Sequence, residues 1–485
     1  MLKTAIIGAG IGGLASAIRL ATKGHQVDVY EANSYPGGKL SEIRLDHYRF
    51  DAGPSLFTMP NYIEELFDLA GKDIHDYFQY ERLEVVCNYL WEDGTRLKAF
   101  GDADAFGKEV QEQLGVDGEL IHKALADSRK KYELTGKTFL HNSLHRSSTW
   151  LNKEVAKALL QLPSLHIFSS MNAVNVRQLQ HPKLVQLFNR FATYNGSNPY
   201  KAPGILNIIP HFEHHLGAYF PKGGMYHITQ ALFQLAKDLG VAFYFEQKVD
   251  EILLHNGKAK GIRVNGEQLD YDRLVSNMDI HFTYKKLLPK AKHPDRLLKQ
   301  KKSTSALIFY WGVARKFDQL HLHNILFSKD YKKEFDQLDA GYIYEDPTIY
   351  INISQKFEAE DAPANCENWF TMINVPNNSG QDWDQLIREA RKNVIAKINR
   401  MLDVDLESLI ECEAMLDPRS IESKTASHTG ALYGTSSNNR MAAFLRHPNF
   451  SRRIDHLYFC GGSVHPGGGI PLCLLSAKIV AEMMH

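Results

Sequence analysis

The stretch TAIIGAGIGGLASA, at residues 4–17, decides the fold because Gly8, Gly10 and Gly13 give it the pattern G-x-G-x-x-G. The first glycine allows a tight turn, the second lets the backbone approach a pyrophosphate, and the third allows a helix to pack closely on a strand. The N-terminus of that helix offers N–H groups and a positive dipole end to an anion. The stretch therefore predicts a dinucleotide-binding turn.

The residues around this turn complete a strand, helix, strand unit. Residues 3–7 are predicted to form a short buried strand, residues 14–22 a helix, and residues 27–30 a second strand. Glu31 follows that second strand, where a carboxylate accepts hydrogen bonds from ribose hydroxyls and repels a 2′-phosphate. The unit predicts a Rossmann-type α/β domain that binds NAD or FAD rather than NADP.

The second half of the chain contains further strand signals. Three apolar runs, at 305–313, 347–353 and 368–375, predict a second sheet. The last residues return to a strand at 457–460, followed by a glycine-rich turn and a helix. We therefore expect the nucleotide-binding domain to be built from discontinuous segments, with the middle of the chain inserted between them.

The middle of the chain is mostly helical in pattern. Examples are 151–162 and 183–191, and Pro182 suits a first helical turn. We expect five divisions of the chain: a first nucleotide-binding part at 1–95, a helical insertion facing substrate or membrane at 96–215, a second nucleotide-binding part at 216–285, a β-sheet substrate domain at 286–425, and a C-terminal nucleotide-binding part at 426–485.

The composition is that of a globular protein and disfavours several functions. Of 485 residues, 44% are hydrophobic and 23% are charged. Lysine plus arginine and aspartate plus glutamate each number 56, so no net positive charge supports nucleic-acid binding. Five well-separated cysteines fit neither a disulfide framework nor a zinc ribbon, which favours a cytoplasmic location. No long uncharged apolar run is present, so we expect any association with the cell membrane to be peripheral.

Two stretches indicate which dinucleotide binds. Residues 31–39, EANSYPGGK, and residues 50–55, FDAGPS, resemble the segments that follow the glycine motif in the flavin amine oxidase superfamily. The glycines and Lys39 suit close contact with phosphate or ribose, and the turn at 53–55 can lay its backbone against a flat ring. The resemblance points to FAD as the cofactor.

Three more stretches resemble the bacterial-type phytoene desaturases and related carotenoid desaturases. They are GSNPYKAP at 196–203, YFPKGGM at 219–225 and, most specifically, YFCGGSVHPGGGIP at 458–471. The resemblance covers nearly the full length. One departure is that Leu472 and Cys473 follow the final proline, where family members commonly carry Gly-Val, so the flavin edge is expected to differ in shape.

The resemblance implies a desaturation that forms a C=C bond next to a polyene, by hydride transfer to flavin N5 followed by proton loss. Residues 438–448 and 459–463 are most similar to desaturases that introduce the 3′,4′ bond of a 1′-hydroxy-γ-carotene-type substrate. Phytoene desaturase, a carotene isomerase or oxygenase, and a non-catalytic carotenoid-binding flavoprotein remain alternatives. The implied partners are a carotenoid, a lipid bilayer surface, and quinone or oxygen as electron acceptor.

The resemblance also assigns residues to the cofactor. Val249 and Asn277 match positions that contact the adenine half, and the glycines before Pro471 open a helix whose dipole can face the pyrimidine edge. No catalytic side chain is assigned. The candidate FAD-binding residues are Gly8, Gly10, Ile11, Gly13, Glu31, Ala32, Lys39, Gly53, Pro54, Ser55, Val249, Asn277, Gly461, Gly462, Gly469, Ile470, Pro471 and Leu472.

Two other features of the sequence allow a metal site and a membrane-contacting segment as alternative interpretations. Two histidine clusters have the spacing of the histidine boxes of di-iron desaturases. Because the sequence predicts no spanning helix, we assign no metal and favour ordinary hydrogen-bonded histidines. The clusters comprise His141, His145, His211, His214 and His215.

An apolar group near Pro163 indicates either an amphipathic core helix, which we favour, or a segment that dips into a membrane interface. Its members are Leu159, Leu160, Leu162, Leu165, Ile167 and Phe168.

Overall fold

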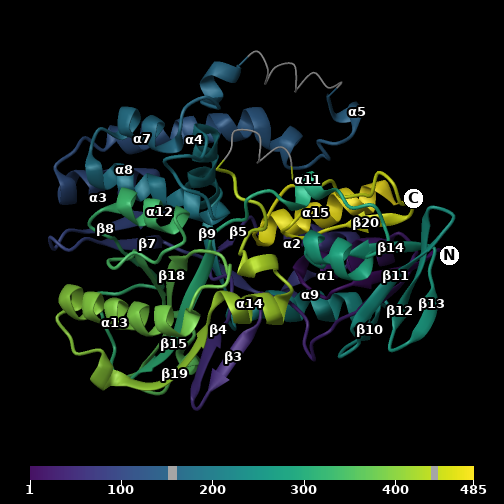
Figure 1. Ribbon diagram of the computed structural model, residues 1–485. Helices are drawn as coiled ribbons and strands as arrows, with labels where there is room; N and C mark the ends of the chain where they lie inside the picture. The colour runs from purple at the N-terminus through teal and green to yellow at the C-terminus, as the bar shows by residue number, and fades with distance from the viewer. Residues whose placement is uncertain (151–160, 439–445, 485) are drawn as a thin grey trace.

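A five-stranded parallel sheet holds the N-terminal glycine turn (Figure 1). The computed structural model describes residues 1–150, 161–438 and 446–484. Segments far apart in the chain meet in this sheet, so the predicted discontinuous Rossmann-type domain is confirmed. In sheet order its strands are β10 (Ala242–Tyr244), β2 (Gln26–Tyr30), β1 (Lys3–Ile7), β14 (Arg273–Ser276) and β20 (Leu457–Phe459).

Helix α1 (Ile11–Thr22) packs against α9 (Tyr226–Asp238) and α15 (Ile470–Met483). It begins three residues before the predicted start at 14, because Gly12 and Gly13 already belong to its first turn. Ten of its twelve residues are buried, so this helix lies in the core rather than on the surface. Helix α2 (Asn61–Ala70) also contacts α1.

A separate seven-stranded sheet is the second large sheet of the molecule. The predicted strands at 305–313, 347–353 and 368–375 are confirmed as β15, β17 and β18. In sheet order the strands are β19 (Ile410–Leu416), β15 (Ser305–Val313), β18 (Glu367–Val375), β17 (Ile349–Asn352), β16 (His323–Leu326), β7 (Val85–Leu90) and β8 (Arg96–Phe100). Strands β7 and β8, which span the expected division at 95, pair in this sheet, and the five expected divisions of the chain stay predictions.

Strand β15 shows how this sheet is covered on both faces. Alternate side chains point to opposite faces of a strand. Leu307, Phe309 and Trp311 pack in the core that includes α13 (Trp383–Leu402), whereas Ile308 and Tyr310 pack in the opposite core. All nine residues of β15 are buried, which explains the continuous apolar run in the sequence.

Helices from the middle of the chain cover one end of the second sheet (Figure 1). The helix predicted at 183–191 is α8, with Pro182 in its first turn. The prediction at 151–162 falls largely on residues 151–160, outside the described part of the chain. The described helices of this region are α3 (Ala103–Leu114), α4 (Glu119–Phe139), α5 (Ser147–Trp150), α7 (Met171–Leu179) and α8 (Pro182–Arg190).

Three small sheets contain the other described strands. No helix among the described residues is long and apolar enough to cross a membrane. The small sheets comprise β3 (Glu42–Leu45) with β4 (Tyr48–Asp51); β5 (Phe57–Thr58), β9 (Ala218–Pro221) and β6 (Tyr80–Arg82); and β11 (Val249–His255), β12 (Lys258–Val264) and β13 (Glu267–Asp270). The remaining α-helices are α10 (Ile280–Phe282), α11 (Asp295–Leu298), α12 (Tyr331–Asp339) and α14 (Pro418–Thr425).

The packing of β15 predicts a large stability difference between two tryptophans. Trp311 is fully buried opposite Trp369, whereas Trp150 is 46% exposed. Trp311→Ala should lower the free energy of unfolding by about 3–5 kcal/mol through lost contacts and a cavity. Trp150→Ala should lower it by about 1 kcal/mol or less. Urea denaturation followed by circular dichroism measures both, and equal losses would contradict the assigned core.

Candidate functional site: a cavity at the ends of the parallel strands

A cavity of about 1600 Å³ opens at the carboxyl ends of β1 and β2, the edge at which open α/β sheets bind ligands. Its wall includes residues from the parallel sheet, the seven-stranded sheet and the helical region. Every candidate FAD-binding residue predicted from the sequence lines this cavity except Gly13. The structure therefore brings together residues that are separated by more than four hundred positions.

Gly13 does not line the cavity, but it allows the turn to pack closely against the start of α1. A Cβ atom at Gly13 would lie 2.1 Å from the backbone oxygen of Gly8, so no other residue fits this close approach. A Cβ atom at Gly10 would lie 2.7 Å from Nδ2 of Asn277. Helix α1 has no side-chain cap and no acidic residue in its first turn, so its N-terminus is suited to bind an anion such as a pyrophosphate.

Glu31 is held rigidly at the end of β2. Its Oε2 accepts a hydrogen bond from the Ala9 N–H (2.8 Å), and its Oε1 accepts one from the Asn33 N–H (2.9 Å). The side chain lines the cavity although the residue is only 7% exposed. A carboxylate oxygen accepts more than one hydrogen bond, so this fixed group fits the ribose hydroxyls of a dinucleotide.

Asn277 connects the two glycine turns of the site. Its Nδ2 donates to the Gly8 oxygen at 3.4 Å, and its Oδ1 accepts from the Cys460 Sγ at 3.5 Å. A Cβ atom at Gly461 would lie 2.6 Å from that same Oδ1. The predicted contact of Asn277 and Val249 with adenine stays a prediction, whereas the bracing role of Asn277 had no signal in the sequence.

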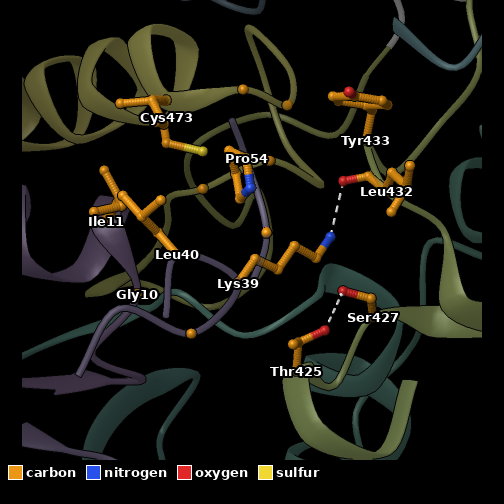
Figure 2. Close-up of a pocket in the computed structure, with 18 of the residues that line it drawn as sticks. Gly10, Ile11, Lys39, Leu40, Pro54, Thr425, Ser427, Leu432, Tyr433 and Cys473 are labelled. Atoms are coloured by element: carbon orange, nitrogen blue, oxygen red, sulfur yellow. Dashed lines mark hydrogen bonds between the residues drawn. The ribbon is translucent and has the colours of Figure 1, made fainter. Parts of the chain in front are cut away.

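Lys39 reaches across the cavity edge toward the C-terminal part of the chain (Figure 2). Its Nζ donates to the backbone oxygens of Ala431 (3.1 Å) and Leu432 (2.8 Å). Burial lowers the pKa of Lys39. The described contacts of this amine thus tie the first segment to the last, and the expected contact with phosphate or ribose stays a prediction.

The N-terminus of α15 forms another part of the cavity wall. Gly469 precedes the helix with φ 109°, Pro471 occupies the first turn, and no acidic residue is present there. Its N–H groups and dipole suit an acceptor such as the pyrimidine edge of a flavin. Cys473 lines the cavity, and burial raises the pKa of its thiol to about 11. This thiol is therefore neutral near pH 7.

The predicted histidine clusters do not assemble a metal centre. Among the described residues, no group of three or more histidine, cysteine, aspartate or glutamate side chains could hold a metal ion. The His211 ring stacks on Tyr132 (centroids 4.6 Å apart) and on His215 (4.7 Å), and burial lowers its pKa to about 4. His214 pairs through Nδ1 with the Phe100 oxygen at 3.1 Å. These rings pack as aromatic side chains.

Sequence reasoning missed a polar group on the inner wall. Ser55 Oγ lies 2.7 Å from the Tyr350 hydroxyl, which lies 2.7 Å from His323 Nδ1. Arg190 and Glu213 line the same wall. Ser55 belongs to the turn predicted at 53–55, but the other four residues come from separate strands, helices and turns and belong to no predicted motif, so only the fold could bring them together.

A parallel nucleotide-binding sheet and a second sheet around one shared cavity define a dinucleotide-dependent oxidoreductase. The chain belongs to the family of flavin containing amine oxidoreductases, whose sequence model matches residues 11–485. It is an FAD-dependent enzyme, and the glycine turn, the fixed Glu31 and the uncapped helix N-termini fit that cofactor.

Relatives and solved structures agree with this assignment. The chain is 50% identical to a 1-hydroxycarotenoid 3,4-desaturase of Flavobacterium sp. (strain P99-3), over 100% of this chain and 99% of that one. It is 34% identical to a 4,4′-diapolycopene oxygenase of Methylomonas sp., covering 98% and 97%. The expected resemblance to carotenoid desaturases is thus confirmed.

The fold is shared more widely. An oxidoreductase from Methanosarcina mazei superposes with a TM-score of 0.65 at 16% identity, covering 99% of this chain and 100% of that one. A putrescine oxidase variant superposes with a TM-score of 0.65 at 12% identity, covering 100% and 98%.

The glycine turn predicts the effect of one substitution on FAD. Gly10→Val should abolish FAD retention, because its side chain meets Asn277 and blocks approach to the backbone. Gly24→Asn is the control, since a Cβ there meets nothing within 4 Å and asparagine tolerates its positive φ. The flavin-to-protein absorbance ratio after gel filtration measures retention. Full retention by the Gly10 variant would contradict the assigned turn.

Proposed function

We propose that this enzyme desaturates a carotenoid, introducing the 3,4 double bond next to the polyene of a 1-hydroxylated substrate. The observation that carries the proposal is the continuity of one cavity from the dinucleotide turn into an apolar channel. The full-length relative at 50% identity, whose name states that reaction, supports it.

The channel wall suits a long hydrocarbon. Beyond the glycine turn at 8–13 the cavity is lined by side chains of the second sheet and of the 3₁₀ turn Gly204–Ile208, namely Ile205, Leu206, Ile308, Ile325, Phe370 and Met372. Such a wall excludes water and binds a polyene mainly by removing apolar surface from water.

When bound, FAD accepts the two electrons and one hydrogen that the substrate loses as a hydride, and the second hydrogen leaves as a proton. The residues of the chain position the reactants. We propose that Gly53, Pro54 and Ser55 lie against the flavin ring and that the N-terminus of α15 faces its pyrimidine edge. Quinone or oxygen is the proposed acceptor that reoxidises the cofactor.

The reaction is tested with the purified holoenzyme under anaerobic conditions. A 1-hydroxycarotenoid in liposomes should bleach the oxidised flavin, and the product should absorb at longer wavelength because its conjugation is longer. Phytoene and a fully conjugated carotenoid serve as comparison substrates. Bleaching by phytoene alone would favour the phytoene desaturase alternative, and no bleaching by any of them would contradict desaturation.

We also propose that the enzyme takes its substrate from a lipid bilayer at the helical region. Phe139, Leu140 and Leu144 line the cavity where α4 ends. The neighbouring Trp150 is 46% exposed, and its Nε1 donates to the Leu144 oxygen at 2.9 Å. Phe168 is 70% exposed in the same region.

A carotenoid dissolves in a bilayer rather than in water, so exposed aromatic side chains beside the cavity suit an interfacial contact. Of the apolar group expected near Pro163, Leu165 is buried, and Ile167 is half-buried. Leu159 and Leu160, with the side chain of Leu162, lie outside the described residues. Cytoplasmic localisation with peripheral attachment follows as part of this proposal.

Liposome flotation tests the membrane contact. The wild type should float with neutral vesicles equally at low and high salt, because the chain has zero formal net charge and apolar burial is not screened. Trp150→Ser combined with Phe168→Ser should reduce the floating fraction severalfold. Tyr342→Ser, at a tyrosine 62% exposed elsewhere on the surface, is the control. Equal flotation of all three proteins would contradict the proposed surface.

A further inference from the structure

A buried charged group interrupts the apolar wall of the cavity. Arg190, the last residue of α8, and Glu213, in the turn His211–His215, both line it and are only 6% and 2% exposed. Their side chains lie 3.6 Å apart. Arg190 donates to the hydroxyls of Tyr194 (2.9 Å) and Tyr89 (2.7 Å), and the Tyr194 hydroxyl donates to Glu213 Oε1.

This group is not fully satisfied by the protein. Glu213 Oε2 and Arg190 Nε have no hydrogen-bond partner among the described residues. Buried charged atoms are costly unless they are paired and hydrogen-bonded. Glu213 Oε2 is paired only with the Arg190 guanidinium, at 3.6 Å, which is longer than a hydrogen bond. No candidate FAD-binding residue belongs to the group, so an acceptor without a hydrogen bond at the cavity wall indicates a polar group on the substrate.

The chemistry of the group selects among polyene end groups. A hydrocarbon end forms no hydrogen bond, and a carbonyl oxygen only accepts, so it would face the Glu213 carboxylate unfavourably. A hydroxyl both donates to a carboxylate and accepts from a guanidinium or a phenol. We propose that Arg190, Tyr194 and Glu213 form an alcohol-binding subsite that recognises the hydroxyl of the carotenoid substrate. This inference rests on the proposed desaturase function.

The subsite lies close to the proposed flavin turn. Ser55, in that turn, is connected through the Tyr350 hydroxyl to His323 by two contacts of 2.7 Å each. Tyr89, whose hydroxyl accepts from Arg190 at 2.7 Å, is in register with Ile325 of β16, and Ile325 is in register with Tyr350 of β17, so the guanidinium and the Tyr350 contacts belong to the same part of the sheet. The subsite is therefore at the flavin end of the channel.

That placement agrees with the position of the proposed reaction. In a 1-hydroxylated end group, carbon 1 is only two bonds from carbon 3, where the new double bond begins. A subsite that holds the hydroxyl must therefore lie within a few ångströms of the reacting carbons. Binding the hydroxyl would fix how far the polyene enters the channel, so these three side chains are positioning and specificity residues.

The inference is tested by comparing a 1-hydroxycarotenoid with the same carotenoid lacking the hydroxyl. The double variant R190M/E213L replaces both charges with apolar side chains of similar size, a change that folded proteins often tolerate. We define the selectivity ratio as kcat/KM for the hydroxylated carotenoid divided by kcat/KM for the carotenoid that lacks the hydroxyl. The double variant should lower this ratio at least tenfold, because only kcat/KM for the hydroxylated substrate should fall. Glu213→Gln, which keeps the side-chain volume, should lower the ratio in the same direction.

Glu367→Gln is the matched control, because Glu367 is a fully buried carboxylate that pairs with Lys356 at 2.7 Å and does not line the cavity. It should leave the ratio unchanged. If the double variant does not retain FAD, Glu213→Gln decides the question. An unchanged ratio in FAD-loaded Glu213→Gln overturns the subsite while leaving desaturation intact, whereas a wild type that oxidises neither substrate overturns both.

Discussion

The close contact between the Gly8 oxygen and the backbone at Gly13 is the constraint on which the site depends. It brings the start of α1 against the end of β1 and aims the helix N-terminus into the cavity. Asn277 fills the space on the other side of the same glycines. Because that side chain also meets Gly461, the position of the first turn fixes the position of the C-terminal turn.

Much of the fold could be predicted from local patterns. A few adjacent residues are enough to predict each of three local structures. These are the turn at 8–13, the acidic residue after the second strand and the buried strand β15. The membership of β7 and β8 in the second sheet could not be read this way. It depends on pairing between residues 88–90 and 324–326, which no local signal encodes.

In the candidate site, too, some residues could be predicted from local sequence patterns and others could not. Glycine patterns and helix starts without acidic residues are visible in the sequence, so the residues that line the glycine-rich half of the cavity could be predicted. The inner wall depends on single polar residues from different elements, such as Arg190 and His323, whose sequence neighbours are unremarkable. Their meaning appears only when burial and missing hydrogen-bond partners are known.

The discontinuous parallel sheet also has a consequence for how the protein is made. Strand β20 and helix α15, at residues 457–483, complete a sheet whose first strand begins at Lys3. During synthesis the nascent chain therefore exposes one edge of β14 and one side of α1 until residues 457–483 have left the ribosome. The cavity wall is incomplete until this segment has folded, and a chain that stops short of it leaves the sheet edge free to pair with other chains.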